Sequence, residues 1–416
     1  MDYRNTCQAK NILLTGASGV LGGRLAAELL KSTTAIIYCI SRCTDIETAK
    51  EKILNVIKVY DPKGELVDEC WRLVPILGNM VEEHFSFAET DYNEFAQSID
   101  LVFHCAANVS LMASYEKLKP TNVDGTQRIV DFCLKAHAPL LFVSSYSVIG
   151  DQLYHECTLQ EDQLDIGQHF EELGYEQSKF EAELLIHNAS DKGLHWAIVR
   201  PGNIWGDSET GAYPLLETRV KGIYYEMIKS LIETGYTYSS DEDFDVTPVD
   251  YVAKASLYIA LNIHQTVHKT YHLTNPNQLT FNQLVNCIRD NGYTIRNIAD
   301  EEYFSALYED RMLLEDKPYR STFTDLLSIF VDEDLIELGK WDTKEAVALL
   351  EKAGIQCPIA DKNLFSTYLK YAAKRNWISD VEEQKLAKII KEMENKIFMQ
   401  HLYDEDFSAS AISAGN

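Results

Sequence analysis

The sequence is poor in several kinds of residue, and each shortage excludes a class of protein. Glycine (20) and proline (10) are scarce among its 416 residues, which excludes a collagen-like or low-complexity chain. Basic residues number 38 against 64 acidic ones, so the formal net charge is −26 and phosphate backbones are repelled. No apolar run is long enough to cross a bilayer, and no signal peptide is apparent. We therefore expect neither a nucleic-acid partner nor a membrane.

The nine cysteines are few for so long a chain, and they show no CxxC pair. Neither they nor the eleven histidines have the spacing of a metal site. Scattered single cysteines are typical of a reducing compartment rather than of a disulfide framework. The sequence thus predicts a cytoplasmic protein that binds no metal.

What the chain does contain is a regular alternation of strand and helix patterns over its first two hundred residues. Near-continuous apolar runs indicate strands that are buried on both faces. Such alternation predicts an α/β fold, a Rossmann-type doubly wound parallel sheet. The predicted strands are residues 11–15, 35–42, 72–77, 100–105, 139–145 and 195–200, and the predicted helices are 22–31, 45–59, 118–136 and 174–188.

The rhythm changes after Gly206, where helical patterns at 215–233, 251–262 and 381–402 dominate. We expect residues 1–206 to form the sheet domain, with 245–275 returning to it. Residues 207–244 and 276–403 would form a smaller, mainly helical substrate lobe. The small and polar residues 404–416 read as a disordered tail.

A glycine-rich turn follows the first predicted strand and opens the first helix. Gly16 permits a tight turn, Gly19 allows a pyrophosphate to approach the backbone, and Gly22 allows close helix packing. The positive end of the helix would face the anion. This strand–turn–helix context predicts a dinucleotide site formed by Thr15, Gly16, Ser18, Gly19, Val20, Leu21 and Gly22.

The end of the second predicted strand bears on which dinucleotide binds. Ser41 and Arg42 stand there, and an arginine suits the 2′-phosphate of NADP. Asp45 stands three residues later and keeps NAD open as the alternative, because an acidic residue there could bind the ribose hydroxyls. Lys52 on the next helix is either a second positive charge for NADP or a solvated lysine.

Three polar side chains form a candidate catalytic group. Tyr175 and Lys179 are four residues apart on a predicted helix and therefore share a face. An ammonium there would lower the pKa of the phenol from its ordinary value near 10. Ser145 ends the fifth predicted strand, at the edge of the sheet where ligands bind, and its hydroxyl can stabilise an oxyanion.

These features together resemble the extended short-chain dehydrogenase/reductase superfamily. The resemblance matches Ser145, Tyr175 and Lys179 to the superfamily's catalytic serine, tyrosine and lysine. It matches Asn122 to the helix asparagine that supports the active site. It also implies further cofactor contacts at Asn79, Ala106, Asn122, Tyr175, Lys179, Pro201 and Ile204.

Within that superfamily the chain resembles the thioester reductase branch, which includes terminal reductase domains of nonribosomal peptide synthetases and carboxylic acid reductases. The stretches that carry the resemblance are residues 38–42, 102–110, 200–211, 245–252 and 354–371. Ser41, Lys52 and Asn79 depart from the branch's usual residues. No adenylation or carrier domain precedes residue 1, so the resemblance implies a freestanding or excised reductase.

The resemblance implies an NADPH-dependent reduction of an acyl or peptidyl thioester to an aldehyde, in some members on to an alcohol. The thioester would come from a carrier protein in trans or from coenzyme A. Arg219, Lys221 and Lys229 are either a docking patch for an acidic carrier protein or a solvated helix face. The branch usually works as a monomer.

Other interpretations stay open at this point. A nucleotide-sugar epimerase or dehydratase would share the same three catalytic residues, and a non-catalytic NADP-binding scaffold would share the glycine turn. His104 and Cys105 are adjacent in the fourth predicted strand and point to opposite faces, so a nucleophilic pair is not expected. Tyr224, Tyr225, Tyr236 and Tyr238 either line a substrate channel or belong to the core of the lobe.

Overall fold

The computed structural model describes residues 3–4, 7–111, 113–150, 158–170, 173–214, 222–299, 301–303, 340–386 and 389. Its centre is a seven-stranded sheet with the order β12-β7-β5-β4-β1-β2-β3, in which every pair of neighbours is parallel. The strands are β1 (Asn11–Thr15), β2 (Ile36–Ser41), β3 (Leu73–Leu77), β4 (Leu101–His104), β5 (Leu140–Val143), β7 (Trp196–Pro201) and β12 (Lys269–Leu273). The Rossmann-type fold class is confirmed.

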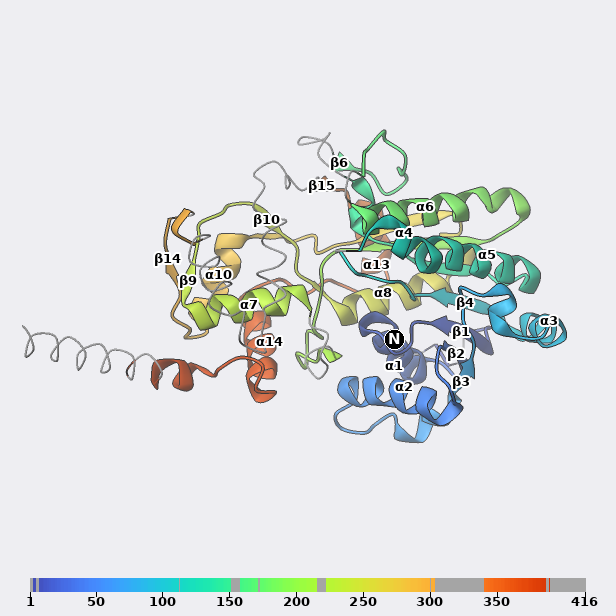
Figure 1. Ribbon diagram of the computed structural model, residues 1–416, viewed down its shortest axis with the longest axis horizontal. Helices are drawn as coiled ribbons and strands as arrows, with labels where there is room; N and C mark the ends of the chain where they lie inside the picture. Colours follow the sequence, from blue (N-terminus) through green and yellow to red (C-terminus); the bar gives the residue numbers. More distant parts are fainter. Residues whose placement is uncertain are drawn as a thin grey trace, which may run out of the picture.

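Helices cover both faces of this sheet (Figure 1). One face packs against α1 (Val20–Ser32), α2 (Ile46–Tyr60), α8 (Val249–Leu261) and α13 (Lys344–Glu351). The other face packs against α3 (Glu89–Ser98), α5 (Gly125–Ala136) and α6 (Gly174–Asn188). The strands are apolar on both sides because each face is covered by a layer of helices. Short elements on this half include α4 (Tyr115–Lys119), α9 (Ile263–Thr266) and the 3-10 helices η1 (Val67–Arg72), η2 (Glu83–Ser86), η4 (Tyr146–Ile149) and η5 (Ser190–Lys192).

A smaller lobe stands beside the sheet domain, at the left of Figure 1. Its helices are α7 (Ile223–Thr234), α10 (Phe281–Asp290) and α14 (Lys362–Lys374), and its short strands pair β9 (Tyr236–Thr237) with β14 (Arg296–Asn297) and β10 (Asp243–Phe244) with β13 (Leu279–Thr280). The lobe has its own aromatic core, in which the fully buried Trp205 stacks on Tyr224 and Tyr368. Trp205 itself belongs to β8 (Ile204–Trp205), which pairs with β11 (Thr247–Pro248).

Several expectations about boundaries need correction. The helix expected at 118–136 is broken by a π-helical turn, η3 (Pro120–Asp124), and the strand expected to reach Ser145 ends at Val143. Residues 276–403 do not all belong to the lobe. Within them, β15 (Lys340–Trp341) pairs with β6 (Thr158–Leu159), and α13 buries Ala346 and Leu350 against the sheet.

Some predicted segments lie outside the described residues. These are residues 215–221 of the helix expected at 215–233, nearly all of 387–403, and the tail at 404–416. Within the described ranges, no helix is long and apolar enough to cross a membrane.

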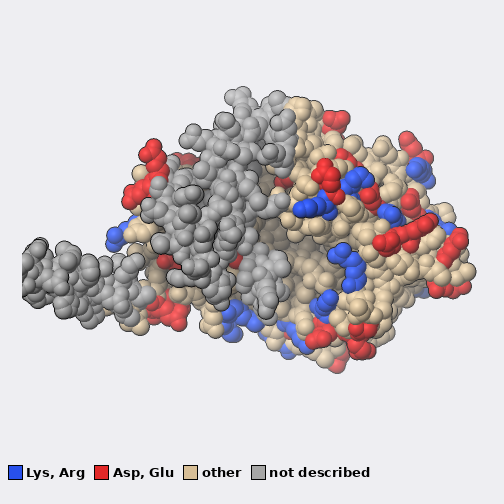
Figure 2. All heavy atoms as spheres, in the orientation of Figure 1, with Lys and Arg blue, Asp and Glu red and all other residues tan. Residues whose placement is uncertain are grey.

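Charge is unevenly spread over the face seen in Figure 2. Lys and Arg side chains stand nearer the middle of this face, whereas many Asp and Glu side chains gather at its right-hand end. The strongly negative total of −26 therefore does not describe every part of the surface.

Candidate active site

The glycine turn between β1 and α1 is shaped by close backbone approaches. Gly16 has φ +76°, and a Cβ there would lie 2.8 Å from the Ala106 backbone nitrogen. A Cβ on Gly22 would lie 2.1 Å from the Gly16 carbonyl oxygen. Neither position tolerates a side chain, since the obstacle is backbone in both cases. These two glycines hold β1, α1 and the segment after β4 together.

The first turn of α1 is open to an anion. Gly19 is its N-cap, with no side-chain cap bond, and no acidic residue stands in the first turn. Ser18 and Gly19 are exposed beside it. Uncapped N–H groups at a helix N-terminus suit a pyrophosphate, so the turn fits the dinucleotide that the sequence predicts.

Two residues of the predicted turn face inward. The Thr15 side chain is buried, and its hydroxyl contacts His104 Nδ1 at 2.8 Å. The Leu21 side chain belongs to the core under α1. Because β1 and α1 turn both side chains toward the core, a cofactor would meet these two residues through their backbone. Thr15 and Leu21 stay predictions as cofactor-binding residues.

The second strand presents positive charge at the predicted place. Arg42 and Lys52 are both exposed, and neither side chain forms a hydrogen bond or ion pair with another described residue. Asp45 is committed elsewhere: it caps α2, accepting from the Thr48 backbone N–H at 2.7 Å and from the Thr48 hydroxyl at 2.8 Å. That use of Asp45 leaves Arg42 and Lys52 as the groups suited to a 2′-phosphate.

The remaining contacts expected near the adenine are less direct. The Ser41 hydroxyl lies 3.2 Å from the Cys43 sulfur, and Asn79 Oδ1 accepts from the Val81 N–H at 3.4 Å. Both side chains are half-buried. They stay predictions.

The structure brings the three candidate catalytic residues together. Tyr175 and Lys179 lie on the first turns of α6, and the Ser145 side chain is close enough to Tyr175 to act on the pKa of its phenol. The Ser145 hydroxyl lies 2.7 Å from that of Ser147, and Lys179 Nζ donates to the Val143 carbonyl at 2.6 Å. The ammonium also stands over the Phe142 ring, 4.2 Å from its centroid.

The electrostatics of this group differ from the expectation. Burial raises the pKa of Tyr175 above 10, and Glu176 raises it further, against a lowering by the Ser145 hydrogen bond. The groups that shift the pKa of Tyr175 do not include Lys179, whose ammonium donates to the Val143 carbonyl. Burial in turn lowers the pKa of Lys179 to about 8, opposed by the Glu183 carboxylate.

Asn122 sits in the π-helical turn and joins two parts of the site. Its Nδ2 donates to the Asn108 carbonyl and to the Ser178 hydroxyl, both at 2.9 Å, and its Oδ1 accepts from the Asn108 N–H at 2.7 Å. An extra residue in a helical turn commonly marks a functional position. The predicted supporting role of Asn122 agrees with these bonds.

The segment after β7 is fixed by residues that the sequence analysis did not single out. A Cβ on Gly202 would lie 2.2 Å from Asp245 Oδ2, and the same oxygen accepts from the Asn203 N–H at 2.6 Å. Pro201 ends β7 and Ile204 begins β8, so both backbone positions depend on Asp245. The sequence signal for this contact was the stretch 245–252, in which the Asp245 carboxylate had been assigned no role.

Two tyrosines converge on the same loop. Asn203 Oδ1 accepts from the Tyr146 hydroxyl at 2.7 Å and from the Tyr224 hydroxyl, which reaches it from α7. Tyr225 is buried in the lobe core, Tyr238 stacks on Phe281, and Tyr236 is exposed. Of the four tyrosines considered for a channel, Tyr224 is therefore the one joined to the loop after β7.

Arg200 is structural. It is fully buried, and its guanidinium forms a bidentate pair with Glu183 of α6, at 2.9 and 2.7 Å. The pair holds β7 against the helix that carries Tyr175.

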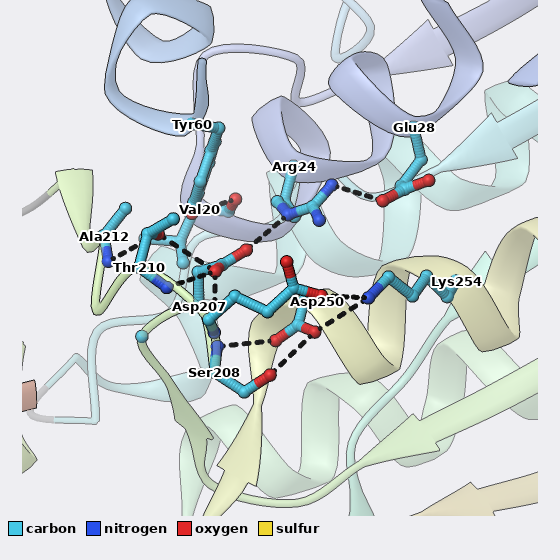
Figure 3. Close-up of polar contacts among 12 residues, drawn as sticks. Val20, Arg24, Glu28, Tyr60, Asp207, Ser208, Thr210, Ala212, Asp250 and Lys254 are labelled. Carbon is cyan, nitrogen blue, oxygen red and sulfur yellow. Dashed lines mark hydrogen bonds and ion pairs between the residues drawn. The ribbon is translucent and has the colours of Figure 1, made fainter. Parts of the chain in front are cut away.

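A second polar cluster ties α1 to the loop that leads into the lobe (Figure 3). Arg24 donates to Asp207 at 3.0 Å and to Glu28 at 2.7 Å. Ser208 donates through its N–H and its hydroxyl to Asp250 of α8, at 2.8 and 3.0 Å. In the sequence, Asp207 and Ser208 appeared only within the stretch 200–211 that carries the family resemblance. Their contacts could not be predicted, because their partners lie far away in the chain.

Lys229 contacts other residues of the lobe, and its docking role stays a prediction. Its ammonium stands 4.3 Å from the centroid of the Trp377 ring and pairs with Glu233 at 3.6 Å, with 22% of the side chain exposed. Arg219 and Lys221 lie outside the described residues.

Across the ranges that the structure describes, no group of three or more His, Cys, Asp and Glu could hold a metal ion.

Comparisons with known proteins find relatives that match most of this chain. A linear gramicidin synthase of Brevibacillus parabrevis is 28% identical over 377 residues, which are 88% of this chain and 7% of that protein. The chain thus spans a small part of the relative. The solved terminal R domain from the myxalamid PKS-NRPS biosynthetic pathway is 28% identical, with a TM-score of 0.79, covering 90% of this chain and 93% of that one.

A further solved structure is a thiolation-reductase di-domain from an archaeal non-ribosomal peptide synthetase. It is 25% identical with a TM-score of 0.72, covering 88% of this chain and 76% of that one. The family model described as male sterility protein, an NAD-binding family, matches residues 14–256, more than half of the chain. With its parallel sheet and glycine turn, the chain belongs to this NAD-binding family.

Proposed function

We propose that this chain is an NADPH-dependent reductase that releases an acyl or peptidyl thioester as an aldehyde. The observation that carries the proposal is the group formed by Ser145, Tyr175 and Lys179, assembled beside an open glycine turn. The similarity to terminal reductase domains over nearly the whole chain supports it. The epimerase and scaffold alternatives have no comparable support.

Cofactor choice follows from the positive charges at the end of β2. Arg42 and Lys52 would hold the 2′-phosphate, the first turn of α1 the pyrophosphate, and Lys179 the nicotinamide ribose. When bound, NADPH supplies a hydride to the thioester carbonyl. A cofactor phosphate is the natural partner for two cations that have none in the described part of the chain.

The chain's own residues handle the charge that develops on the carbonyl oxygen. The Ser145 hydroxyl donates a hydrogen bond to this oxyanion, and the Tyr175 hydroxyl donates its proton to it. Because burial raises the pKa of Tyr175, the phenol carries its proton at neutral pH. The tetrahedral hemithioacetal then loses the thiol and leaves the aldehyde.

The thioester donor is a carrier protein or coenzyme A. The structural relative that contains a thiolation domain supports a carrier protein. A monomeric, cytoplasmic enzyme remains our prediction.

The test follows NADPH oxidation by the purified protein with acyl-coenzyme A and acyl-carrier thioesters, with NADH in parallel and products identified by mass. We expect an aldehyde or alcohol together with a free thiol, and faster turnover with NADPH than with NADH. Reaction with a nucleotide sugar instead would assign the chain to the epimerases, and cofactor binding without any turnover would support a scaffold.

A further inference from the structure

A buried histidine lies between the glycine turn and the catalytic helix, and the proposed reaction assigns it no task. His104 is the last residue of β4 and is 1% exposed. Its Nδ1 lies 2.8 Å from the Thr15 hydroxyl of β1, and its Nε2 lies 3.1 Å from the Thr126 hydroxyl of α5. The imidazole therefore bridges β1 and α5.

The hydrogen bonds around His104 admit one arrangement of protons. Thr126 donates its hydroxyl proton to the Asn122 carbonyl at 2.6 Å, so toward His104 it can only accept. His104 Nε2 must then carry the proton, and Nδ1 must accept from Thr15. The Thr15 oxygen in turn accepts the N–H groups of Cys105 and Ala106, both at 3.1 Å.

A neutral imidazole suits this place. Burial, together with the nearby Lys179 ammonium, lowers the pKa of His104 to about 3. The ring therefore keeps one donor and one acceptor throughout the neutral pH range. It acts as a fixed two-ended link rather than as an acid or base.

The Nδ1 arm ends at the cofactor side of the site. Thr15 accepts from the N–H groups of Cys105 and Ala106, and the Ala106 backbone nitrogen is the nearest atom that a Cβ on Gly16 would meet. A shift of Thr15 would move the segment after β4 against the glycine turn.

The Nε2 arm ends at the catalytic helix. Thr126 binds the Asn122 carbonyl, Asn122 Nδ2 donates to the Ser178 hydroxyl at 2.9 Å, and Ser178 donates to the Tyr175 carbonyl at 2.7 Å. All the linking side chains are buried, so water does not replace a lost bond readily.

We propose that His104 is a positioning residue with two separable tasks: Nδ1 sets the cofactor-side segment through Thr15, and Nε2 sets Tyr175 through Thr126, Asn122 and Ser178. The second task rests on the proposed reductase function, whereas the first needs only cofactor binding.

Two substitutions separate the tasks. Asparagine places an amide oxygen at the bond distance of Nδ1 and does not reach Thr126, while glutamine places an amide N–H at the bond distance of Nε2. His104→Asn should bind NADPH like the wild type and lose turnover about fivefold to tenfold. His104→Gln should keep kcat and bind NADPH about fivefold to tenfold more weakly. The same substitutions at the exposed His264 of α9 serve as matched controls.

Direct NADPH titration, steady-state kcat and amide hydrogen exchange of residues 105–108 and 174–178 give the readouts. Opposite patterns in the two variants support the proposal. The proposal is overturned if both variants lose NADPH affinity and kcat together in proportion to lost stability. It is also overturned if neither NADPH affinity nor kcat changes. If a variant does not fold, Thr15→Val and Thr126→Val take its place, because each removes one arm. Thr15→Val must then weaken NADPH binding and keep kcat, and Thr126→Val must lower kcat and keep NADPH binding, or the proposal fails.

A wild-type protein that reduces no thioester would overturn the proposed function and not the two-arm role of His104. Binding and exchange then decide: faster exchange confined to 174–178 in His104→Asn, and to 105–108 in His104→Gln, supports the two arms. Equal exchange changes in both segments would contradict them.

Discussion

At the residue scale, hydrogen bonds to neighbouring groups hold the side chains of the proposed catalytic group. Lys179 is bonded to the Val143 carbonyl and Ser145 to Ser147, so neither side chain can swing freely. Such commitment costs side-chain entropy during folding rather than during the reaction. Of these three residues, we assign the transferred proton to the Tyr175 phenol.

Tyr175→Phe should therefore remove turnover while sparing cofactor binding. We expect kcat to fall by a factor of about 10² to 10⁴, because the proton donor is lost and the ring is retained. NADPH oxidation and NADPH titration measure the two effects. Tyr236→Phe, the same change at an exposed tyrosine of the lobe, should leave both unchanged; retained turnover in Tyr175→Phe would assign the proton donor elsewhere.

The pKa of Lys179 predicts an alkaline limit to activity. Because burial lowers this pKa to about 8, the ammonium loses its proton as the pH rises through that value. Nicotinamide ribose binding should weaken there, so the KM for NADPH should rise between about pH 7 and about pH 9. A KM that stays flat over this interval would show that Lys179 does not hold the cofactor.

At the scale of elements, the glycine turn depends on α1 lying against it. Gly22→Ala would place a methyl group 2.1 Å from the Gly16 carbonyl oxygen, so α1 must move away. We expect the Kd for NADPH to rise at least about tenfold. Gly193→Ala, with φ +93° and open space around it, carries only backbone strain and is the control for stability.

The join between α1 and the lobe-bound loop is a buried charge cluster. Arg24→Met would leave Asp207 and Glu28 without the guanidinium that pairs with them. The Arg24 side chain is 12% exposed, and the two carboxylate side chains are each 7% exposed. Loss of one partner from a buried pair costs about 3–5 kcal/mol of unfolding free energy.

Urea unfolding of Arg24→Met measures this cost. Lys63→Met removes one partner of an exposed pair and should cost less than about 1 kcal/mol. Equal costs for the two variants would show that the cluster in Figure 3 contributes no more than a surface pair.

At the scale of the whole molecule, two buried carboxyls make stability depend on pH. Burial raises the pKa of Glu161 to about 7 and that of Asp245 to about 6, against the hydrogen bonds that each accepts. Between their ordinary values and these raised values, the folded state binds more protons than the unfolded state. Stability should therefore fall as the pH rises from about 5 to about 8.

Urea unfolding at several pH values checks this slope. Glu161 accepts N–H groups from both β12 and α13, so Glu161→Gln should flatten the slope while weakening α13. A slope unchanged by the substitution would mean that other groups set the pH dependence.

The sequence by itself determined the succession of strands and helices in the first half and the glycine turn, and it made Ser145, Tyr175 and Lys179 the candidate catalytic residues. Those features depend on local apolar periodicity and on short spacings, which a chain displays in one dimension. The helix 174–188 has the expected bounds for the same reason.

Only the tertiary structure decided which side chains face the site and which partners fix it. Thr15 turns inward and Lys179 bonds to Val143, because neighbouring strands offer acceptors that no local pattern reveals. Asp245, His104 and Arg24 find partners 42, 89 and 183 residues away in the chain. Such pairings arise when strands and helices stack, so burial and long-range hydrogen bonding, rather than sequence spacing, decided them.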